Sequence, residues 1–425
     1  MTATMAPSPT LTATFTPTPF PTPSPTPTPE PAVLLSQAEE AYRVGDWETA
    51  AAAYGQLLPL SSIPQEVAFR AALGWSKTRI AQGRAAEGLP LLRDLTATLP
   101  PEDPRQAELQ LFLADALAAN GDPLAAAPHY RSTLTAAPLL APYAYQWLGD
   151  ALFAGGVYTE ALTAYDAALN LATALDRQVF LQEKRALTYS ALQAYPEALA
   201  TYDAILAVSR IPAYRARIMY QAAETARLFG DAAEAQQRYL DLITTYPEEA
   251  TFSHPALAWL VENEVPVNEL LRGKINYYAQ SYSAAVLALG RYVRADAAHT
   301  GEAHYFAGMA YLEAGSPELA LNEFQILLDT HPDDTYWGSA VIGKGRALAA
   351  LGRLPEAIAA YRSLPESLPD HARTPEALWS AAQALERDGE LPAAALAYLE
   401  LAERYPDDSG APAARFRAGL LRYQA

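Results

Sequence analysis

The chain has 425 residues, 51% of them hydrophobic, which is ample material for an apolar core. It contains no cysteine, and this excludes disulfide bonds, thiolate zinc sites, iron–sulfur clusters and cysteine nucleophiles. The formal net charge of −18, from 48 acidic and 30 basic residues, argues against a chain-wide surface for nucleic-acid phosphates. No run of about 18 apolar residues is present, so no membrane-spanning segment is expected. These properties are typical of a binding protein.

Residues 1–31 differ in composition from the rest of the chain. They contain ten Pro, ten Thr and no Gly, Lys or Arg, and from Pro17 to Pro31 every second residue is Pro. Proline favours an extended backbone, and so few apolar residues cannot offset the entropy lost on ordering. We therefore predict a disordered stalk or linker over residues 1–31.

The first residues also bear on location. Met1 is followed by Thr-Ala-Thr, without the basic residues and apolar stretch of a signal peptide. Two alternatives follow. The protein is cytoplasmic, or it is extracytoplasmic in the cell envelope and an export or anchor segment lies upstream of the given start. A Pro/Thr-rich stalk favours the envelope.

From residue 32 onward the chain is repetitive. A turn position recurs at intervals of 38, 38, 35, 37, 37, 50, 35, 37 and 37 residues, and the long interval contains an insertion near residues 248–267. The turn positions are Gly45, Gly83, Gly121, Gly156, Gln193, Gly230, Gln280, Gly315, Gly352 and Gly389. Such a period indicates stacked units of two helices each.

Small and bulky residues keep a fixed register to these turns. Seven residues before each turn stands Gly, Ala or Ser, five residues after it Ala or Gly, and nine residues after it a bulky residue, aromatic in eight of ten units. Small residues let two helices approach closely, and the bulky residue fills the space beside them. The sequence thus predicts a helical hairpin around every turn.

Local signals define the ends of these helices. Glycine at the turn can adopt the left-handed conformation that ends the first helix, and Asp46, Asp122 and Asp231 can cap the second. A proline seventeen residues after the turn should end the second helix. These prolines are Pro100, Pro138, Pro247, Pro332, Pro369 and Pro406.

We therefore predict an all-α fold, a right-handed α-solenoid of about ten helix pairs. Six repeats are expected over residues 32–247, an irregular insertion over 248–267, and four repeats with an unpaired terminal helix over 268–425. That last helix begins near Pro412, and its own turn would fall at position 426. A solenoid normally ends in a polar capping helix. The missing partner favours a chain that continues, the alternative being that this helix is the cap.

The pattern resembles the tetratricopeptide repeat (TPR). The resemblance is carried by the ten turns and is most evident in the segments Tyr145–Tyr165 and Gly301–Pro332. These repeats normally recur every 34 residues, so the spacing of about 37 implies longer links between units. The resemblance implies that the first helix of each unit lines a concave groove in which a protein or peptide binds.

A narrower resemblance is to the helical N-terminal region of bacterial soluble lytic transglycosylases. It is carried by Val265–Ala279, the link at Tyr405-Pro-Asp-Asp and the final segment Ala414–Tyr423. In that family the helices precede a lysozyme-like domain with a catalytic Glu-Ser and a Gly-Leu-Met-Gln segment. Neither carries over, because the only Glu-Ser pair, Glu366-Ser367, is expected in a link between repeats. No catalytic residue is assigned.

The chain shows no catalytic, metal or cofactor motif. None of its six histidines forms an i, i+4 pair, and His299 and His304, five apart, are expected on different sides of a helix. Each histidine is interpreted as a surface or link residue. Gly343-Lys-Gly345 lacks the spacing of a phosphate loop and falls at the small-residue position of a helix.

The candidate site residues are those that the repeat register places on the groove. They are Tyr143, Gln146, Asp150, Arg217, Tyr220, Glu224, Lys274, Tyr277, Tyr278, Tyr305, Met309, Glu313, Trp379, Gln383 and Arg387. Aromatic residues mixed with polar ones suit contact with peptide or glycan, although each tyrosine could instead pack between repeats.

The leading hypothesis is therefore a scaffold without catalytic activity that binds protein or peptide partners and needs no cofactor. The alternative is the N-terminal region of a peptidoglycan lytic transglycosylase whose catalytic domain follows residue 425, in which case peptidoglycan is a possible ligand. A co-chaperone clamp for acidic tails is disfavoured by the acidic composition of the chain.

Overall fold

The protein is described by a computed structural model that covers residues 30–295 and 298–424. Within these residues it consists of 22 α-helices and one short 3₁₀-helix, without β-strands. The all-α prediction is confirmed. The predicted stalk falls almost wholly outside the described residues, and helix α1 already begins at Pro31. No described helix combines the length and apolar character needed to cross a bilayer.

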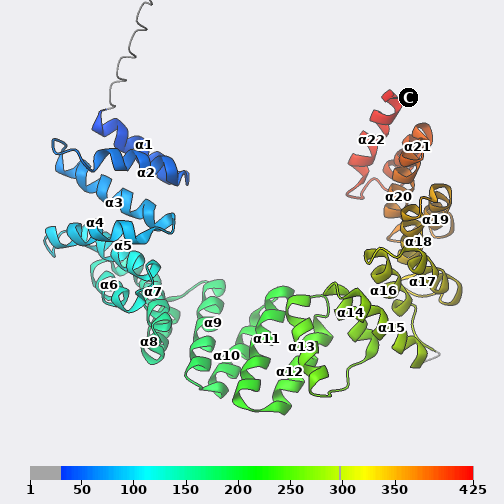
Figure 1. The fold of residues 1–425 in the computed structure, drawn as a ribbon, viewed down its shortest axis with the longest axis horizontal. Coiled ribbons are helices and arrows are strands. Elements are labelled where there is room, and N and C mark those ends of the chain that lie inside the picture. The colour runs from blue at the N-terminus through cyan, green and yellow to red at the C-terminus, as the bar shows by residue number, and fades with distance from the viewer. Residues whose placement is uncertain (1–29, 296–297, 425) are drawn as a thin grey trace, which may run out of the picture. The chain divides into compact units, whose positions relative to one another are not determined.

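The described part of the chain divides into two compact units, one ending at Gly155 and the other beginning at Gly156. The helices of the first unit are α1 (Pro31–Arg43), α2 (Trp47–Leu57), α3 (Gln65–Ala81), α4 (Ala85–Thr98), α5 (Gln106–Ala119), α6 (Pro123–Ala136), the 3₁₀-helix η1 (Pro138–Leu140) and α7 (Ala141–Ala154). Each helix packs against the next one along the chain, as the blue-to-cyan part of Figure 1 shows.

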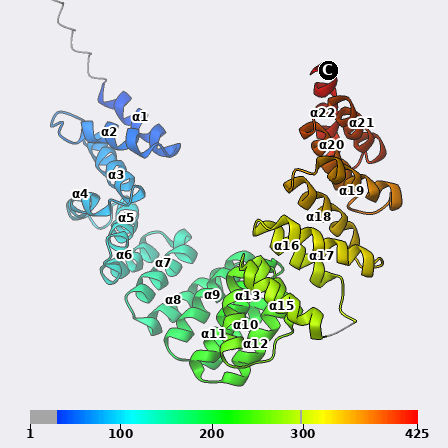
Figure 2. The same cartoon turned by 45° about the vertical axis from the view of Figure 1, so that its right-hand side comes forward.

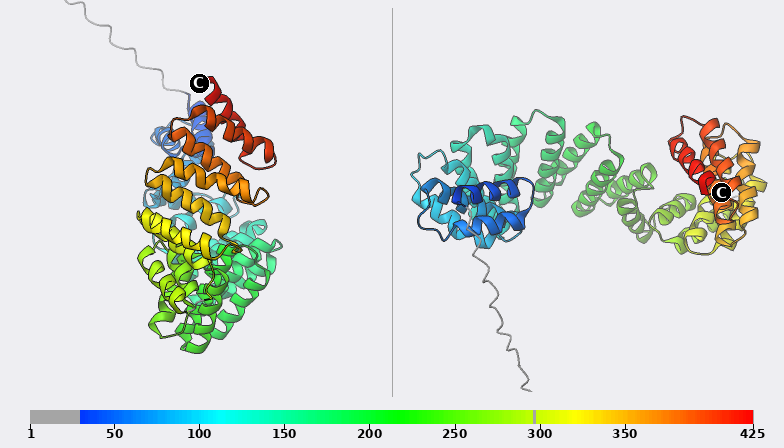
Figure 3. Two further views of the ribbon diagram at one scale, coloured as in Figure 1. Left: turned by 90° about the vertical axis from the view of Figure 1, so that its right-hand side faces the viewer. Right: turned by 90° about the horizontal axis from the view of Figure 1, so that it is seen from above.

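The second unit repeats the same arrangement over a longer stretch. Its helices are α8 (Tyr158–Leu171), α9 (Leu175–Ala191), α10 (Tyr195–Val208), α11 (Pro212–Phe229), α12 (Ala232–Thr245), α13 (Ala250–Glu262), α14 (Glu269–Tyr278), α15 (Tyr282–Ala295), α16 (Glu302–Glu313), α17 (Pro317–Thr330), α18 (Trp337–Ala350), α19 (Leu354–Ser367), α20 (Thr374–Arg387), α21 (Leu391–Arg404) and α22 (Ala411–Gln424). The hairpins α16–α17, α18–α19 and α20–α21 follow one another in Figure 2, and Figure 3 shows this stacking from two further sides.

All ten predicted turn positions adopt the left-handed conformation. Eight are glycines with φ between 71° and 87°, and the other two are Gln193 (φ 60°) and Gln280 (φ 59°). The predicted aspartate caps are also present, since the side chains of Asp46, Asp122 and Asp231 accept hydrogen bonds from the backbone three residues later. The second helices with a following proline end two residues before it, because the residue preceding a proline disfavours the helical conformation.

The core is a series of helix contacts at the small residues. The bulky residue nine positions after each turn is at most 5% exposed in every repeat. It fits against the small residue on the first helix. A Cβ atom added to Gly308 would lie 2.7 Å from the Phe324 ring, and one added to Gly273 would lie 2.4 Å from Leu289. This contact recurs along the array and confirms the expected packing.

Two expectations about irregular segments are wrong. The insertion at 248–267, expected to be irregular, contains helix α13, whose apolar side Ala256, Leu257 and Leu260 is buried against its neighbours. Its internal Pro255 lies in the second turn. Glu366-Ser367, expected in a link, forms the last residues of α19, because this helix accommodates Pro365 and the link begins at Leu368.

Helix α22 ends the described chain. It packs against α21 through Ala411, Ala414, Ala418 and Leu421. Its Gly419 occupies the small-residue register of a first helix, yet nothing lies within 4 Å of an added Cβ atom there. Helix α22 thus has the character of a first helix, in agreement with the sequence pattern.

Candidate functional site

The candidate site is a groove on the face formed by three first helices of the second unit, α18, α20 and α22. It has a volume of about 940 Å³. Its lining residues are Arg346, Ala349, Ala350, Tyr361, Trp379, Ser380, Gln383, Ala384, Glu386, Arg387, Tyr398 and Arg417. Helix α20 contributes half of them and forms the centre, and Tyr361 and Tyr398 reach in from the second helices α19 and α21.

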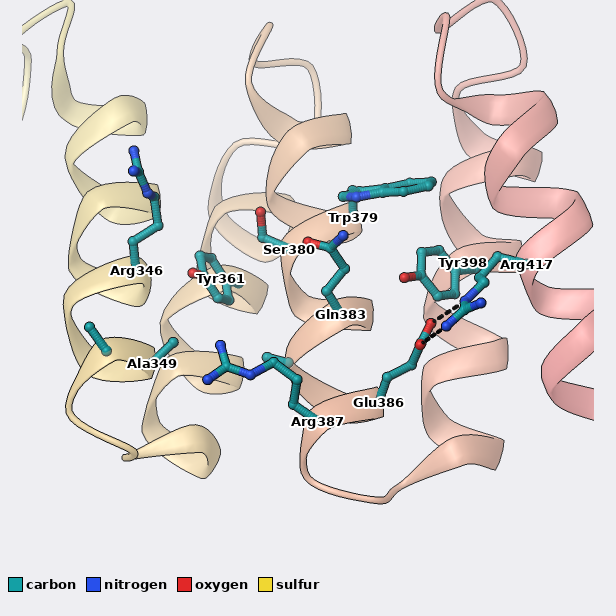
Figure 4. A pocket seen from close by; sticks show the side chains of 12 residues that line it. Arg346, Ala349, Tyr361, Trp379, Ser380, Gln383, Glu386, Arg387, Tyr398 and Arg417 are labelled. Carbon is teal, nitrogen blue, oxygen red and sulfur yellow. Dashed lines mark hydrogen bonds and ion pairs between the residues drawn. The ribbon is translucent and has the colours of Figure 1, made fainter. Parts of the chain in front are cut away.

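Three predicted residues lie together in this groove. Trp379, Gln383 and Arg387 follow one another along α20, one turn apart, because residues spaced by four share a helix face. Figure 4 shows Gln383 and Arg387 between the Tyr361 ring on one side and Tyr398 on the other. The Trp379 ring packs edge-on against Tyr398, with centroids 5.0 Å apart.

The arginines of the groove differ in their pairing. Arg346 forms an ion pair of 3.2 Å with Glu313, and Arg417 binds Glu386 through two hydrogen bonds of 2.9 and 2.5 Å, drawn dashed in Figure 4. Arg387, in the last turn of α20, forms no ion pair with any residue in the described part of the chain. Among the described residues, Arg387 is thus the one arginine of the groove without an ion-pair partner.

The pKa values of three groups in the groove are shifted by this arrangement. The hydrogen bond from Arg417 lowers the pKa of Glu386 below its ordinary value, so this carboxylate stays charged in mild acid. Burial raises the pKa of Tyr361 to about 12 and also raises that of Tyr398, which keeps both phenols neutral. The walls of the groove thus offer neutral aromatic rings and fixed charges, and none of these groups is poised to transfer a proton near pH 7.

The other predicted residues are distributed over four further helices. On α7, the ring centroid of Tyr143 lies 6.1 Å from that of Trp147, and Gln146 donates to Asp150 over 3.5 Å. On α11, Arg217 makes a two-pronged ion pair with Glu183 of α9. These polar groups already satisfy one another.

Further contacts on α11 are mainly aromatic. The Tyr220 ring lies 6.0 Å from both Tyr239 and Phe252, and Glu224 accepts hydrogen bonds from Arg227 and Tyr239. The tyrosine therefore packs between neighbouring helices, which is the structural role that its sequence left open.

Helices α14 and α16 share an aromatic cluster. Tyr277 and Tyr278 of α14 pack against Phe306 at 5.4 and 5.8 Å, and Tyr305 stacks on Tyr336 at 4.7 Å. Lys274 binds Glu302 over 2.6 Å. Met309 is 9% exposed, and Glu313 pairs with Arg346. Most of these side chains join adjacent repeats.

Sequence reasoning missed several residues of the groove. Arg346 stands six residues before the turn at Gly352, the register that Gln383 has before Gly389, so the repeat could have revealed it. Glu386 and Arg417 are 31 residues apart in the sequence. They meet only because α22 stacks on the hairpin formed by α20 and α21. No local signal indicates that pair.

The histidines differ from expectation. His299 and His304 were expected on different helix sides, but their Nε2 atoms are 3.0 Å apart, because His299 lies in the link before α16 rather than on the helix. His304, expected near the surface, is 5% exposed. In the part of the chain that the structure describes, no three His, Asp or Glu side chains are arranged to hold a metal ion.

Comparison with known proteins gives a consistent family. One tetratricopeptide repeat profile matches residues 73–141, 113–177, 270–335, 338–372 and 370–409, and a second matches 217–249, together more than half of the chain. No curated protein matches the sequence. Because the matching profiles describe tetratricopeptide repeats, the narrower resemblance to lytic transglycosylases gains no support from them.

Several solved structures are similar in fold. A tetratricopeptide repeat protein from Parabacteroides merdae has 16% identity and a TM-score of 0.28, covering 65% of this chain and 98% of that one. Rap protein complexed with Competence and Sporulation Factor has 15% identity and a TM-score of 0.33, covering 88% and 99%. Yeast Tom70 has 12% identity and a TM-score of 0.34, covering 93% and 96%.

Proposed function

Since the chain belongs to the tetratricopeptide repeat family, we propose that it is a scaffold without catalytic activity that binds a protein or peptide segment in the groove of α18, α20 and α22. The observation that carries this proposal is the row Trp379, Gln383 and Arg387 on one accessible helix face. It presents an aromatic ring, an amide and a guanidinium that forms no ion pair with any described residue. Aromatic and arginine side chains are the residue types that dominate binding energy at protein interfaces.

The charges of the groove favour a segment that carries carboxylates. The residues that line the groove include three arginines and one acidic residue, Glu386. The whole chain, in contrast, has a net charge of −18. The pairs of Arg346 and Arg417 are largely exposed on the arginine side, 46% and 44%, and such pairs contribute little on their own. An incoming carboxylate can therefore compete for these guanidinium groups, while the acidic surroundings repel the same ligand elsewhere.

The proposal is tested by trapping the partner at a defined position. A photo-crosslinking amino acid at Gln383, which lies exposed in the groove, should capture a partner from an extract of the source cells. The matched control is the same amino acid at Gln325 on α17, which lines a different hollow between α17, α18 and α19. Equal capture at both positions would contradict the assignment of the groove.

The trapped partner then allows a quantitative test. Arg387→Gln should weaken its binding about tenfold, equivalent to about 1.4 kcal/mol, and weaken the dependence of affinity on salt. Lys344→Gln on the other side of α18 removes a charge of the same sign and should leave affinity unchanged. The thermal unfolding of both variants should match the wild type, since the change at Arg387 breaks no ion pair with a residue that the structure describes.

We also propose that the protein lies in the cell envelope and that it acts beside a peptidoglycan-cleaving domain. The first rests on the composition of residues 1–31, and the second on the sequence resemblance alone. Fractionation of the source cells tests the first. Sedimentation of the protein with purified peptidoglycan tests the second, and failure to co-sediment would leave protein binding as the function.

A further inference from the structure

The hairpin pattern of the second unit is broken at α13. This helix ends in a left-handed turn at Glu264, with φ of 58°. The amides of Glu264 and Val265 donate to carbonyls three and five residues earlier, as in the hairpin turn at Gly315. Helix α13 thus has the ending of a first helix. The chain then runs directly into α14, itself a first helix with its turn at Gln280, so no second helix lies between them (Figure 1).

A hollow of about 240 Å³, the α13 hollow, lies beside this break between α13, α14 and α15. On α14 it is lined eight and four residues before the hairpin turn, by Arg272 and Asn276. On α15 it is lined four, seven and eleven residues after that turn, by Ala284, Leu287 and Arg291. A second hollow, the α17 hollow, lies between α17, α18 and α19 and is lined by α18 and α19 at the same five positions.

The two hollows differ in their remaining wall. In the α17 hollow this wall is the second helix α17, whereas in the α13 hollow it is the first helix α13. Leu257 of α13 lies seven residues before the turn and lines the hollow. At this position other first helices have a small residue that packs against their own second helix, as Gly308 does against Phe324. The α13 hollow therefore opens on surfaces that a second helix covers in the other repeats.

The charged groups at the α13 hollow are not balanced. Arg291 forms two hydrogen bonds of 2.9 Å with Glu269, and Arg272 lies 3.8 Å from the same carboxylate. No acidic side chain is among the described residues that line the hollow. The side chains of Arg272 and Arg291 are 32% and 43% exposed, so these pairs are weak and open to competition. Two guanidinium groups share one carboxylate, which leaves one positive charge in excess.

Elsewhere in the second unit, neighbouring second helices pair their charges. Glu400 of α21 lies 3.6 Å from Arg362 of α19, and Arg238 of α12 lies 2.7 Å from Asp203 of α10. Arg291 stands eleven residues after its turn, the position that Glu400 has in its own repeat. Because the neighbour of α15 at this place is not a second helix, a carboxylate from a docked helix would complete the pattern at Arg291.

We propose that the α13 hollow docks an amphipathic α-helix of a partner protein, in the place that a second helix takes in the other repeats. The apolar face of the docked helix packs against Leu287 and against Val261 of α13, which both line the hollow. Leu287 is 63% exposed, so docking removes this side chain from water. A carboxylate three or four residues along the same face binds Arg272 and Arg291. An amphipathic helix laid into an apolar groove is a common mode of peptide recognition.

The probe for this site is a library of displayed peptides, selected on the full chain. Each peptide has 14 residues, the length of α15 and α17. We expect peptides that combine apolar residues three or four apart with Asp or Glu, and whose affinity falls about tenfold for Leu287→Ser. They should gain helical circular dichroism on binding. A selection without any peptide sensitive to Leu287→Ser would overturn the proposal, and so would sensitive peptides that bind in an extended conformation.

Leu396→Ser is the matched control for the apolar contact. Leu396 of α21 stands seven residues after its turn, as Leu287 does, and is 60% exposed. Its substitution should leave the affinity of the selected peptides unchanged, and an equal loss in both variants would refute the assignment to the hollow. The α13 hollow shares no residue with the groove of α18, α20 and α22, so Arg387→Gln should also have no effect on these peptides.

Charge substitutions test the carboxylate of the docked helix. Arg291→Gln should weaken the selected peptides about tenfold and reduce the dependence of their affinity on salt. Arg294→Gln removes another arginine of α15, outside the lining of the hollow, and should leave the affinity unchanged. Glu269→Gln should strengthen binding, because it removes the carboxylate that competes for both arginines. Weaker binding in Glu269→Gln would overturn the role given to the arginines.

A second copy of the chain is the competing occupant of the hollow. Sedimentation equilibrium of the full chain should give the same mass for the wild type and for Leu287→Ser. A dimer of the wild type that dissociates in this variant would overturn the proposal in favour of self-association through the α13 hollow.

Discussion

The ring of Tyr361 occupies the space that a side chain at position 345 would need. A Cβ atom added to Gly345 would lie 2.4 Å from Cε1 of Tyr361, far inside van der Waals contact. The tyrosine is 4% exposed on α19, and the glycine is on the facing side of α18. The hairpin can close at this distance only because position 345 has no side chain.

Gly345→Ala should therefore destabilise the second unit by about 1–3 kcal/mol through overpacking against Tyr361, despite the better helix propensity of alanine. Gly419→Ala is the matched control, because the same register position on α22 has open space around it. That change should stabilise the protein by about 0.5–1 kcal/mol. Urea unfolding of both variants measures the change in the free energy of unfolding, which should be negative for Gly345→Ala and positive for Gly419→Ala. Equal changes would contradict the close contact between Gly345 and Tyr361.

Ala357→Leu should destabilise by about 1–3 kcal/mol, because Ala357 is completely buried where α19 crosses the neighbouring helices. Ala359→Leu adds the same atoms two residues away at an exposed position and should change the free energy of unfolding by less than about 0.5 kcal/mol. Thermal unfolding distinguishes them. A similar loss for the exposed position would point to helix propensity rather than to packing.

Glycine at position 280 should give a more stable protein than the glutamine that occupies this turn. Gln280 has φ of 59°, a conformation that costs an L-residue about 1–2 kcal/mol and glycine almost nothing. Part of this gain is lost to the flexibility of glycine in the unfolded chain, so Gln280→Gly should stabilise by about 0.5 kcal/mol. Gly315→Ala, the reverse change at φ 76°, should destabilise by about 1 kcal/mol. Denaturant midpoints measure both, and the same sign for both would be inconsistent with this account.

The Glu386–Arg417 pair predicts a pH dependence of stability. Arg417 lowers the pKa of Glu386 in the folded state, so its contribution is present above the ordinary glutamate pKa of about 4.3 and is lost as pH falls through the folded value. Because the arginine side of the pair is 44% exposed, Arg417→Met should lower the melting temperature at pH 7 only slightly, and less still below pH 4. A constant difference across this range would show that Arg417 acts through its aliphatic packing instead.

The sequence alone determined the repeat, the helix ends and the helix contacts. These features are local: a left-handed turn needs glycine or its tolerated substitutes, and a second helix ends before its proline. The register of small and bulky residues, as at Gly308 and Phe324, follows from helix geometry within one hairpin. The helix in the insertion was not predicted, because α13 contains a proline, Pro255, and lacks the small and bulky residues at the spacing of the other repeats.

Only the tertiary structure decided which groove side chains remain available. Arg217 and Arg387 both lie on first helices, but Arg217 pairs with Glu183, 34 residues away, whereas Arg387 has no ion pair among the described residues. His299 and His304 likewise meet because the link folds back onto α16. A side chain's partner belongs to the neighbouring repeat, and the way one repeat stacks on the next depends on contacts that no single hairpin encodes.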